Sequence, residues 1–134
     1  MEKFEIKQTA HTPYFKIDFD LGEIVYKGRF IPDIDAFNFL QPIYNAIEEY
    51  AQSPLMLTNF NVYYEYVNTG NLHSFIKLFK ALKKLEDQGI ELMCKWHYDG
   101  ENDEDSIDMC EHVSDNSGLK FTLIDDSESD DALF

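Results

Sequence analysis

Residues 66–79 read Tyr66-Val67-Asn68-Thr69-Gly70-Asn71-Leu72-His73-Ser74-Phe75-Ile76-Lys77-Leu78-Phe79. Apolar side chains alternate up to Val67, as in a strand, and recur with a helical period after Leu72. The stretch therefore predicts a strand that leaves a sheet and turns sharply into a helix with Asn68 or Thr69 at its first positions. Side-chain oxygens there suit the free N–H groups of a first turn. A helix start also favours an anion, so Thr69 is either a cap or a site for a phosphate.

The composition is that of one soluble domain with its own core. The chain has 134 residues, of which 44% are apolar and 15% aromatic. No apolar run approaches the ~20 residues of a membrane span. The first residues lack signal-peptide character, and the two cysteines, Cys94 and Cys110, make no disulfide framework. We expect reduced thiols in a cytoplasmic protein.

The net charge is −15, which argues against nucleic acid and anionic membrane as partners. Half of the 26 acidic residues lie from Asp99 onward, where Lys120 is the only basic residue. The acidity is therefore concentrated in the C-terminal third.

Residues 1–11 are interpreted as a loose N-terminal arm. Strand alternation over 14–20, a turn at Leu21-Gly22 and a second strand over 23–29 predict a β-hairpin. Asp33 or Asp35 is expected to cap a helix that ends at Ser53-Pro54. Pro42 predicts a kink, or a short helix followed by a longer one. The inner face of this helix is expected to consist of Phe37, Leu40, Tyr44, Ile47 and Ala51.

Residues 55–67 predict the longest strand, with a shift in parity that indicates burial of both faces early on, or a bulge. A helix follows Thr69 and stops at Gly89, a strand covers 90–98, and strand, helix and strand form a parallel unit. An acidic loop, a helix through Cys110 and a strand over 119–124 follow, and 125–134 is interpreted as a frayed acidic tail. The fold class is thus α/β: one domain over 12–124, with a mixed sheet of about five strands against two or three helices.

Metal and catalytic sites have weak support in the sequence. The acidic stretch 99–105 lacks the glycine and the final Glu of a calcium loop. Cys94, His97, Cys110 and His112 match no zinc spacing, and Cys94 is expected to face the core. No nucleophile elbow or phosphate-binding glycine loop is found, so we expect a non-catalytic protein without a cofactor.

One outer stripe of the central helix is basic, which is unusual on so acidic a chain. Its members are His73, Lys77, Lys80 and Lys84. The stripe is either a solvated helix face or a docking face for an acidic partner.

Several short motifs, in order, resemble one family over residues 12–124. They are Thr12-Pro13, Gly28-Arg29, Pro32-Asp33, Tyr66-Val67-Asn68-Thr69, Trp96-His97-Tyr98 and Asp103-Glu104-Asp105. The order of elements resembles the STAS-like domains of anti-sigma factor antagonists. The motifs resemble more closely the SiaC-type family of bacterial regulatory phosphoproteins.

That resemblance implies a function. In the family, the Thr of an Asn-Thr-Ser-Ser-like turn is phosphorylated, and Thr69 occupies that position here. A dedicated kinase adds the phosphate and a metal-dependent phosphatase removes it. The unmodified form binds and activates a diguanylate cyclase, which raises cyclic di-GMP and promotes biofilm. Here Gly70 and Asn71 replace the serines, and Phe30-Ile31 replaces Ser-Tyr.

The predicted site therefore has Thr69 as phosphate acceptor, with Asn68, Gly70, Asn71, His73 and Lys77 on the partner surface. Three alternatives stay open: partner switching like that of an anti-sigma factor antagonist, a static interaction domain in which Thr69 is only a cap, and a small metal-dependent enzyme that uses Asp103 and Asp105. Homo-oligomerisation is also open.

Overall fold

The computed structural model describes residues 3–33 and 35–127. One sheet carries six strands in the order β1-β2-β3-β4-β5-β6. The strands are β1 (Lys3–Ile6), β2 (Tyr14–Asp18), β3 (Glu23–Phe30), β4 (Leu57–Val67), β5 (Glu91–Tyr98) and β6 (Phe121–Asp125). The first three strands pair antiparallel and the last four parallel, so the sheet is mixed as predicted.

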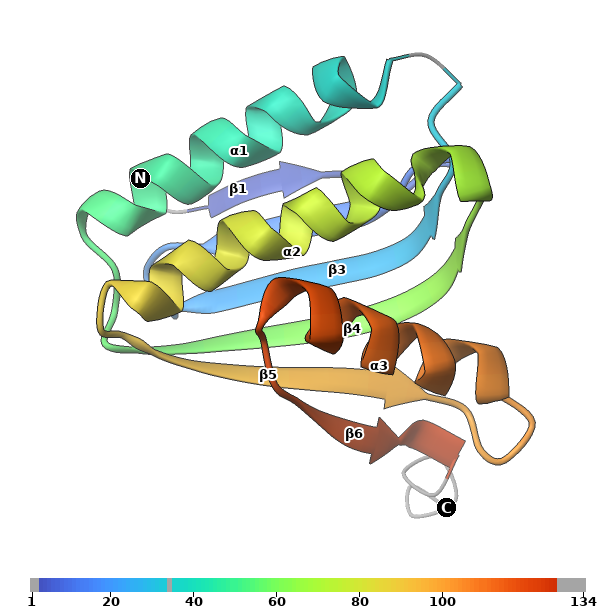
Figure 1. Cartoon of the computed structure of the whole chain (residues 1–134). Helices are drawn as coiled ribbons and strands as arrows, with labels where there is room; N and C mark the ends of the chain where they lie inside the picture. The colour runs from blue at the N-terminus through green and yellow to red at the C-terminus, as the bar shows by residue number, and fades with distance from the viewer. Residues whose placement is uncertain (1–2, 34, 128–134) are drawn as a thin grey trace.

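Three helices connect the parallel strands: α1 (Ala36–Gln52), α2 (Leu72–Asp87) and α3 (Glu104–Ser117). Each crossover moves one strand further in the same direction, and crossovers of one hand then place every helix on one face. Figure 1 shows the three helices on the same side of the sheet, each beginning at the end where its preceding strand finishes. The carboxyl ends of β3, β4 and β5 and the starts of α1, α2 and α3 therefore share one edge, called here the carboxyl edge.

The core lies between the helices and the sheet. Its centre is an aromatic cluster in which Phe75 and Phe79 of α2 contact Tyr26, Phe60 and Trp96 of the sheet. All five side chains are fully buried. The apolar stripe that the sequence predicts for the central helix is confirmed by the burial of Phe75, Ile76, Phe79, Leu82 and Leu85.

The N-terminal arm prediction is wrong for Lys3–Ile6, which pair with β2 as the sixth strand. Phe4 and Ile6 pack against the core, and the Phe4 ring meets Phe15 edge-on. Alternation over only four residues gave too short a signal to distinguish this strand from a coil.

Helix α1 corrects two predictions. Asp35 caps it as expected, but it runs unbroken through Pro42. Pro42 has no backbone N–H, so the carbonyl of Asn38 loses its partner in the helix. Both residues are exposed, and water can bind that carbonyl. The buried face is rotated from the predicted one: Phe37 is 60% exposed and Ala51 lies at the margin of the core. The buried residues are Leu40, Ile43, Ala46, Ile47 and Tyr50.

Strand β4 has its irregularity at the end, not at the start. The early residues Leu55 and Leu57 are exposed, so burial of both faces there is wrong. The register shifts opposite Gly28 and Arg29, where Tyr64 pairs with Gly28 and Tyr66 with Arg29. Glu65 is the extra residue of a bulge, which turns Tyr66 outward and Val67 inward.

Candidate functional site

The predicted phosphate-accepting turn lies at the carboxyl edge. Strand β4 ends at Val67, a single 3-10 turn covers Thr69–Asn71, and α2 begins at Leu72. The backbone N–H of Asn71 donates to the Asn68 carbonyl at 3.0 Å, and the N–H of Leu72 donates to the Thr69 carbonyl. The Asn71 side-chain amide also donates to the Asn68 Oδ1 at 2.7 Å. The two asparagine side chains therefore bond to each other across the turn and stabilise it.

Thr69 itself is exposed, and its hydroxyl makes no hydrogen bond within the described chain. Neither Asn68, which precedes the 3-10 turn, nor Asn71, which precedes α2, caps with its side chain. The first turn of α2 carries no acidic residue. The predicted position at a helix start is therefore correct, and of the two roles left open for Thr69, the capping hydrogen bond is not formed.

The remaining predicted partner residues divide between two surfaces. A Cβ atom built on Gly70 would meet only the Asn68 amide nitrogen, at 3.8 Å, so the exposed face of the turn has room for a side chain. His73 is exposed and is the second residue of α2. Lys77 lies further along, on a groove between α1 and α2, with Lys80 and Lys84. The structure thus places Lys77 apart from the turn.

Beside the turn, the bulge in β4 creates a surface that the sequence did not predict. Tyr66, 52% exposed, lines two adjoining hollows with Tyr64. One hollow also includes Arg29 and Asp103, and the other extends to Leu72 and the α3 side chains, among them Met109 and His112. The parity shift along residues 55–67 left a bulge open, but it did not place the bulge at Glu65 or predict that Tyr66 is exposed.

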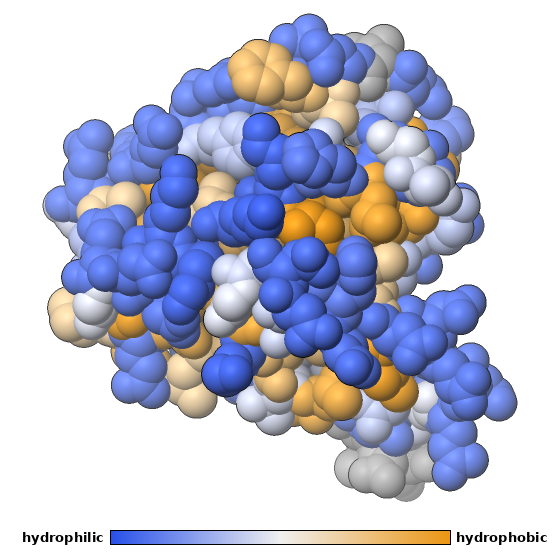
Figure 2. Space-filling model, in the orientation of Figure 1, coloured by the Kyte–Doolittle hydropathy of each residue, from blue (hydrophilic) through white to orange (hydrophobic). Residues whose placement is uncertain are grey.

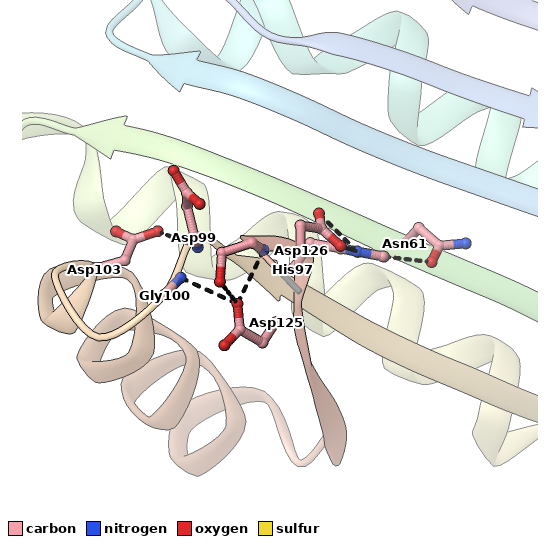
Figure 3. A network of polar contacts seen from close by, with 8 residues as sticks. Asn61, His97, Asp99, Gly100, Asp103, Asp125 and Asp126 are labelled. Atoms are coloured by element: carbon pink, nitrogen blue, oxygen red, sulfur yellow. Dashed lines mark hydrogen bonds and ion pairs between the residues drawn. The ribbon is translucent and has the colours of Figure 1, made fainter. Parts of the chain in front are cut away.

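A polar network connects residues of the acidic C-terminal third with one another and with Asn61 of β4 (Figure 3). The His97 ring contacts Asp126 through Nδ1 at 3.0 Å and Asn61 through Nε2 at 2.8 Å, and stacks on Tyr63 with ring centres 4.1 Å apart. Asp125 accepts hydrogen bonds from the N–H groups of Gly100 and Ser127.

These contacts correct the frayed-tail prediction for residues 125–127, while residues 128–134 lie outside the described part. They also give the acidic loop a structural role, because Asp103 accepts a hydrogen bond from the N–H of Asp99 at 3.0 Å.

The four residues considered as zinc ligands do not lie together; they are Cys94, His97, Cys110 and His112. Cys94 is buried on the helix-covered face of β5, as predicted, and His97 points to the opposite face. Cys110 is buried on α3, and burial raises the pKa of both thiols to about 12. Within residues 3–33 and 35–127, no three His, Cys, Asp or Glu side chains are arranged to hold a metal ion. No helix in that part is both long and apolar enough to cross a bilayer.

Comparison with known proteins gives one family. The family model described as "SiaC family regulatory phosphoprotein" matches residues 6–126. The crystal structure of apo-SiaC from Pseudomonas aeruginosa is similar to this chain with a TM-score of 0.76 and 17% identity, covering 92% of this chain and 98% of that one.

A chain in the crystal structure of the diguanylate cyclase SiaD in complex with its activator SiaC, from the same organism, has a TM-score of 0.75 and 18% identity. That match covers 90% of this chain and 97% of the other. At such identities the structural likeness shows the fold alone. The comparison with curated proteins found no match.

Proposed function

Because the chain belongs to the SiaC family of regulatory phosphoproteins, we propose that it is a phosphorylation switch whose acceptor is Thr69. The unmodified chain binds an effector protein, and the phosphorylated chain releases it. The family description is that of a regulatory protein, in agreement with the expectation that this chain is not an enzyme.

The observation that supports Thr69 most strongly is its exposed hydroxyl, which has no hydrogen-bond partner in the described chain. A kinase can reach such a group without opening the fold. Phosphorylation adds about 1.5 to 2 negative charges and three acceptor oxygens. The start of α2 has no side-chain cap and no acidic residue in its first turn, so the positive end of the helix favours the new charge.

Asn68, Gly70, Asn71 and His73 form the surroundings that a kinase, a phosphatase or an effector would contact. Since the asparagine side chains are bonded to each other, the turn keeps one shape, and the change on phosphorylation is mainly one of charge. Gly70 and Asn71 stand where the resemblance implies serines. The cognate kinase and metal-dependent phosphatase therefore meet a turn with fewer hydroxyl groups here.

We propose a diguanylate cyclase as the effector, since one of the similar structures is a SiaC protein in complex with a cyclase that it activates. The aromatic hollows beside the turn support this choice of surface. Exposed tyrosines such as Tyr66 are typical anchors of protein interfaces, and this one lies three residues before Thr69 in the chain.

The test combines phosphate mapping with partner binding. Protein isolated from its host is digested and fragmented to locate phosphate on the peptide that contains Thr69. In pull-downs, Thr69→Ala retains the effector and Thr69→Asp loses it. Ser74→Ala is the matched control, because it removes a hydroxyl from a half-buried residue in the first turn of α2, five positions after Thr69. Equal recovery of a cyclase by Thr69→Ala and Thr69→Asp, with no phosphate on that peptide, contradicts the proposal.

A further inference from the structure

A groove of about 620 Å³ lies between α1 and α2 on the helix-covered side of the sheet. Its surface is mainly apolar, and Tyr44, Ile47, Ala51, Ala81 and Leu85 line it. Tyr44, Ala51 and Ala81 are only partly buried, although they pack against the core. Figure 2 shows this side of the molecule as largely hydrophilic, with apolar surface visible in patches between the polar side chains.

One wall of the groove is basic. Lys77, Lys80 and Lys84 are all exposed and recur along α2 at the spacing of one helix face. None of them forms an ion pair with a described residue, whereas Lys83, which does not line the groove, binds Glu86 at 2.6 Å and Asp87 at 3.4 Å. Among the described residues that line the groove, three are lysines and Glu48 is the only acidic one. The local charge of the groove is therefore opposite in sign to the net charge of −15.

We propose that this groove binds an amphipathic helix of a partner protein, with a row of carboxylates beside an apolar stripe. The basic row from Lys77 to Lys84 is about 10 Å long at ~1.5 Å per residue, or two helical turns. Carboxylates spaced by three or four residues on a partner helix match that row. The neighbouring apolar residues of the same helix would lie on Tyr44 and Ala81. This is the helix-in-groove form of recognition, with charge setting the register.

The basic row and the apolar lining of the groove favour an acidic amphipathic helix over nucleic acid or an anionic membrane. Nucleic acid and anionic membrane present phosphates at high density, which the remaining negative charge of the chain repels. Neither offers apolar side chains for the groove. At physiological ionic strength charges act over about 8 Å, so a partner with a few carboxylates responds to the nearby lysines and not to the whole chain.

The groove does not depend on the proposed phosphorylation switch. Lys80 and Lys84 lie eleven and fifteen residues after Thr69, which corresponds to about 16 and 22 Å along the helix at ~1.5 Å per residue. Both separations exceed the screening length, so a phosphate on Thr69 leaves binding at this groove nearly unchanged. Either proposal can therefore fail without the other.

The experiment measures fluorescence anisotropy of a labelled 18-residue amphipathic peptide of Glu, Leu and Ala titrated with the full chain. The same composition in scrambled order and a Lys-for-Glu version are the control peptides. The expected result is saturable binding of the amphipathic acidic peptide, weakened by salt, and little binding of the scrambled one.

The variants locate the binding. Lys80→Glu with Lys84→Glu is expected to weaken binding at least about tenfold, and Ala81→Gln, which adds bulk without charge, weakens it as well. Lys27→Glu with Lys120→Glu is the matched control, because it changes the net charge equally at exposed lysines outside the groove, and it is expected to leave affinity within about threefold. Circular dichroism checks that each variant is folded.

In the peptide assay, the proposal is overturned by no binding of the acidic peptide at about 1 mM, by equal weakening in both double variants, or by loss of binding in Thr69→Asp. Sedimentation of the chain alone tests a second copy as the occupant. Self-association that Lys80→Glu with Lys84→Glu abolishes would assign the groove to the chain itself and would also overturn it.

Discussion

Replacing Thr69 by Ala tests directly whether the Thr69 hydroxyl contributes to the stability of the fold. We expect the free energy of unfolding to change by no more than about 0.5 kcal/mol, because the hydroxyl is exposed and unbonded in the described chain. A functioning Ser or Thr cap costs about 1 kcal/mol on replacement by Ala. The higher helix propensity of Ala recovers a few tenths of a kcal/mol within the turn.

Asp35→Ala provides the matched control at the start of α1. The Asp35 carboxylate accepts a hydrogen bond from the N–H of Phe37 at 3.0 Å, so its removal is expected to lower the free energy of unfolding by about 1 kcal/mol. Urea titration of both variants, followed by the fluorescence of the single, fully buried Trp96, gives the two values under the same conditions.

A loss of 1 kcal/mol or more in Thr69→Ala would show that the hydroxyl is a cap, and the argument from its exposure would fail. Thr69→Asp tests how a negative charge at this turn changes the stability. A carboxylate at the start of α2 is expected to leave stability unchanged or to raise it by about 0.3–1 kcal/mol. A strongly destabilised Thr69→Asp would indicate that charge at this turn disrupts the fold instead of changing its surface.

Three further predictions concern the core and the turns. Ser106→Ala removes the buried acceptor of the tryptophan N–H, 2.9 Å away, and is expected to cost about 1–3 kcal/mol in urea unfolding. Burial raises the pKa of Cys94 and Cys110 to about 12, so at pH 8 a thiol reagent should label the two thiols only on unfolding. The two buried thiols contribute fully to the free energy of unfolding below pH 9, and this contribution falls as the pH rises towards 12. Gly70→Ser should leave the melting temperature unchanged. Gly28→Ser should lower it, because Gly28 has a φ of 122° and a Cβ added there would come within 2.8 Å of the Gln8 side chain.

The central part of the fold could be predicted because its sequence pattern is long and regular. The stripe from Leu72 to Leu85 has a clear helical period, and the strands on either side carry their apolar residues on one face. The order of strand, helix and strand then implies a parallel pair. Short or irregular features gave no comparable signal, as Lys3–Ile6 shows: a four-residue strand becomes stable only when its partner and the core are present.

The candidate site was predictable in position but not in detail. A change of period at Thr69 placed a turn at a helix start, and the structure has one there. The hydrogen bonds were not predictable, since Asn68 can cap a helix or bond to a neighbour, and the choice depends on the geometry of the turn. The exposure of Tyr66 depends on the bulge at Glu65, which reverses the facing of one residue without changing the composition of the strand.

The sequential order of the strands in the sheet has a consequence for how the chain folds. Every strand pairs with the strands next to it in the sequence, so no strand waits for a distant segment before it can join. Loop closures are limited to single crossovers, and short closures favour rapid folding. A nascent chain emerging from the ribosome can add strands one at a time, and both strands that flank the turn with Thr69 and helix α2 are present as soon as β5 has been synthesised.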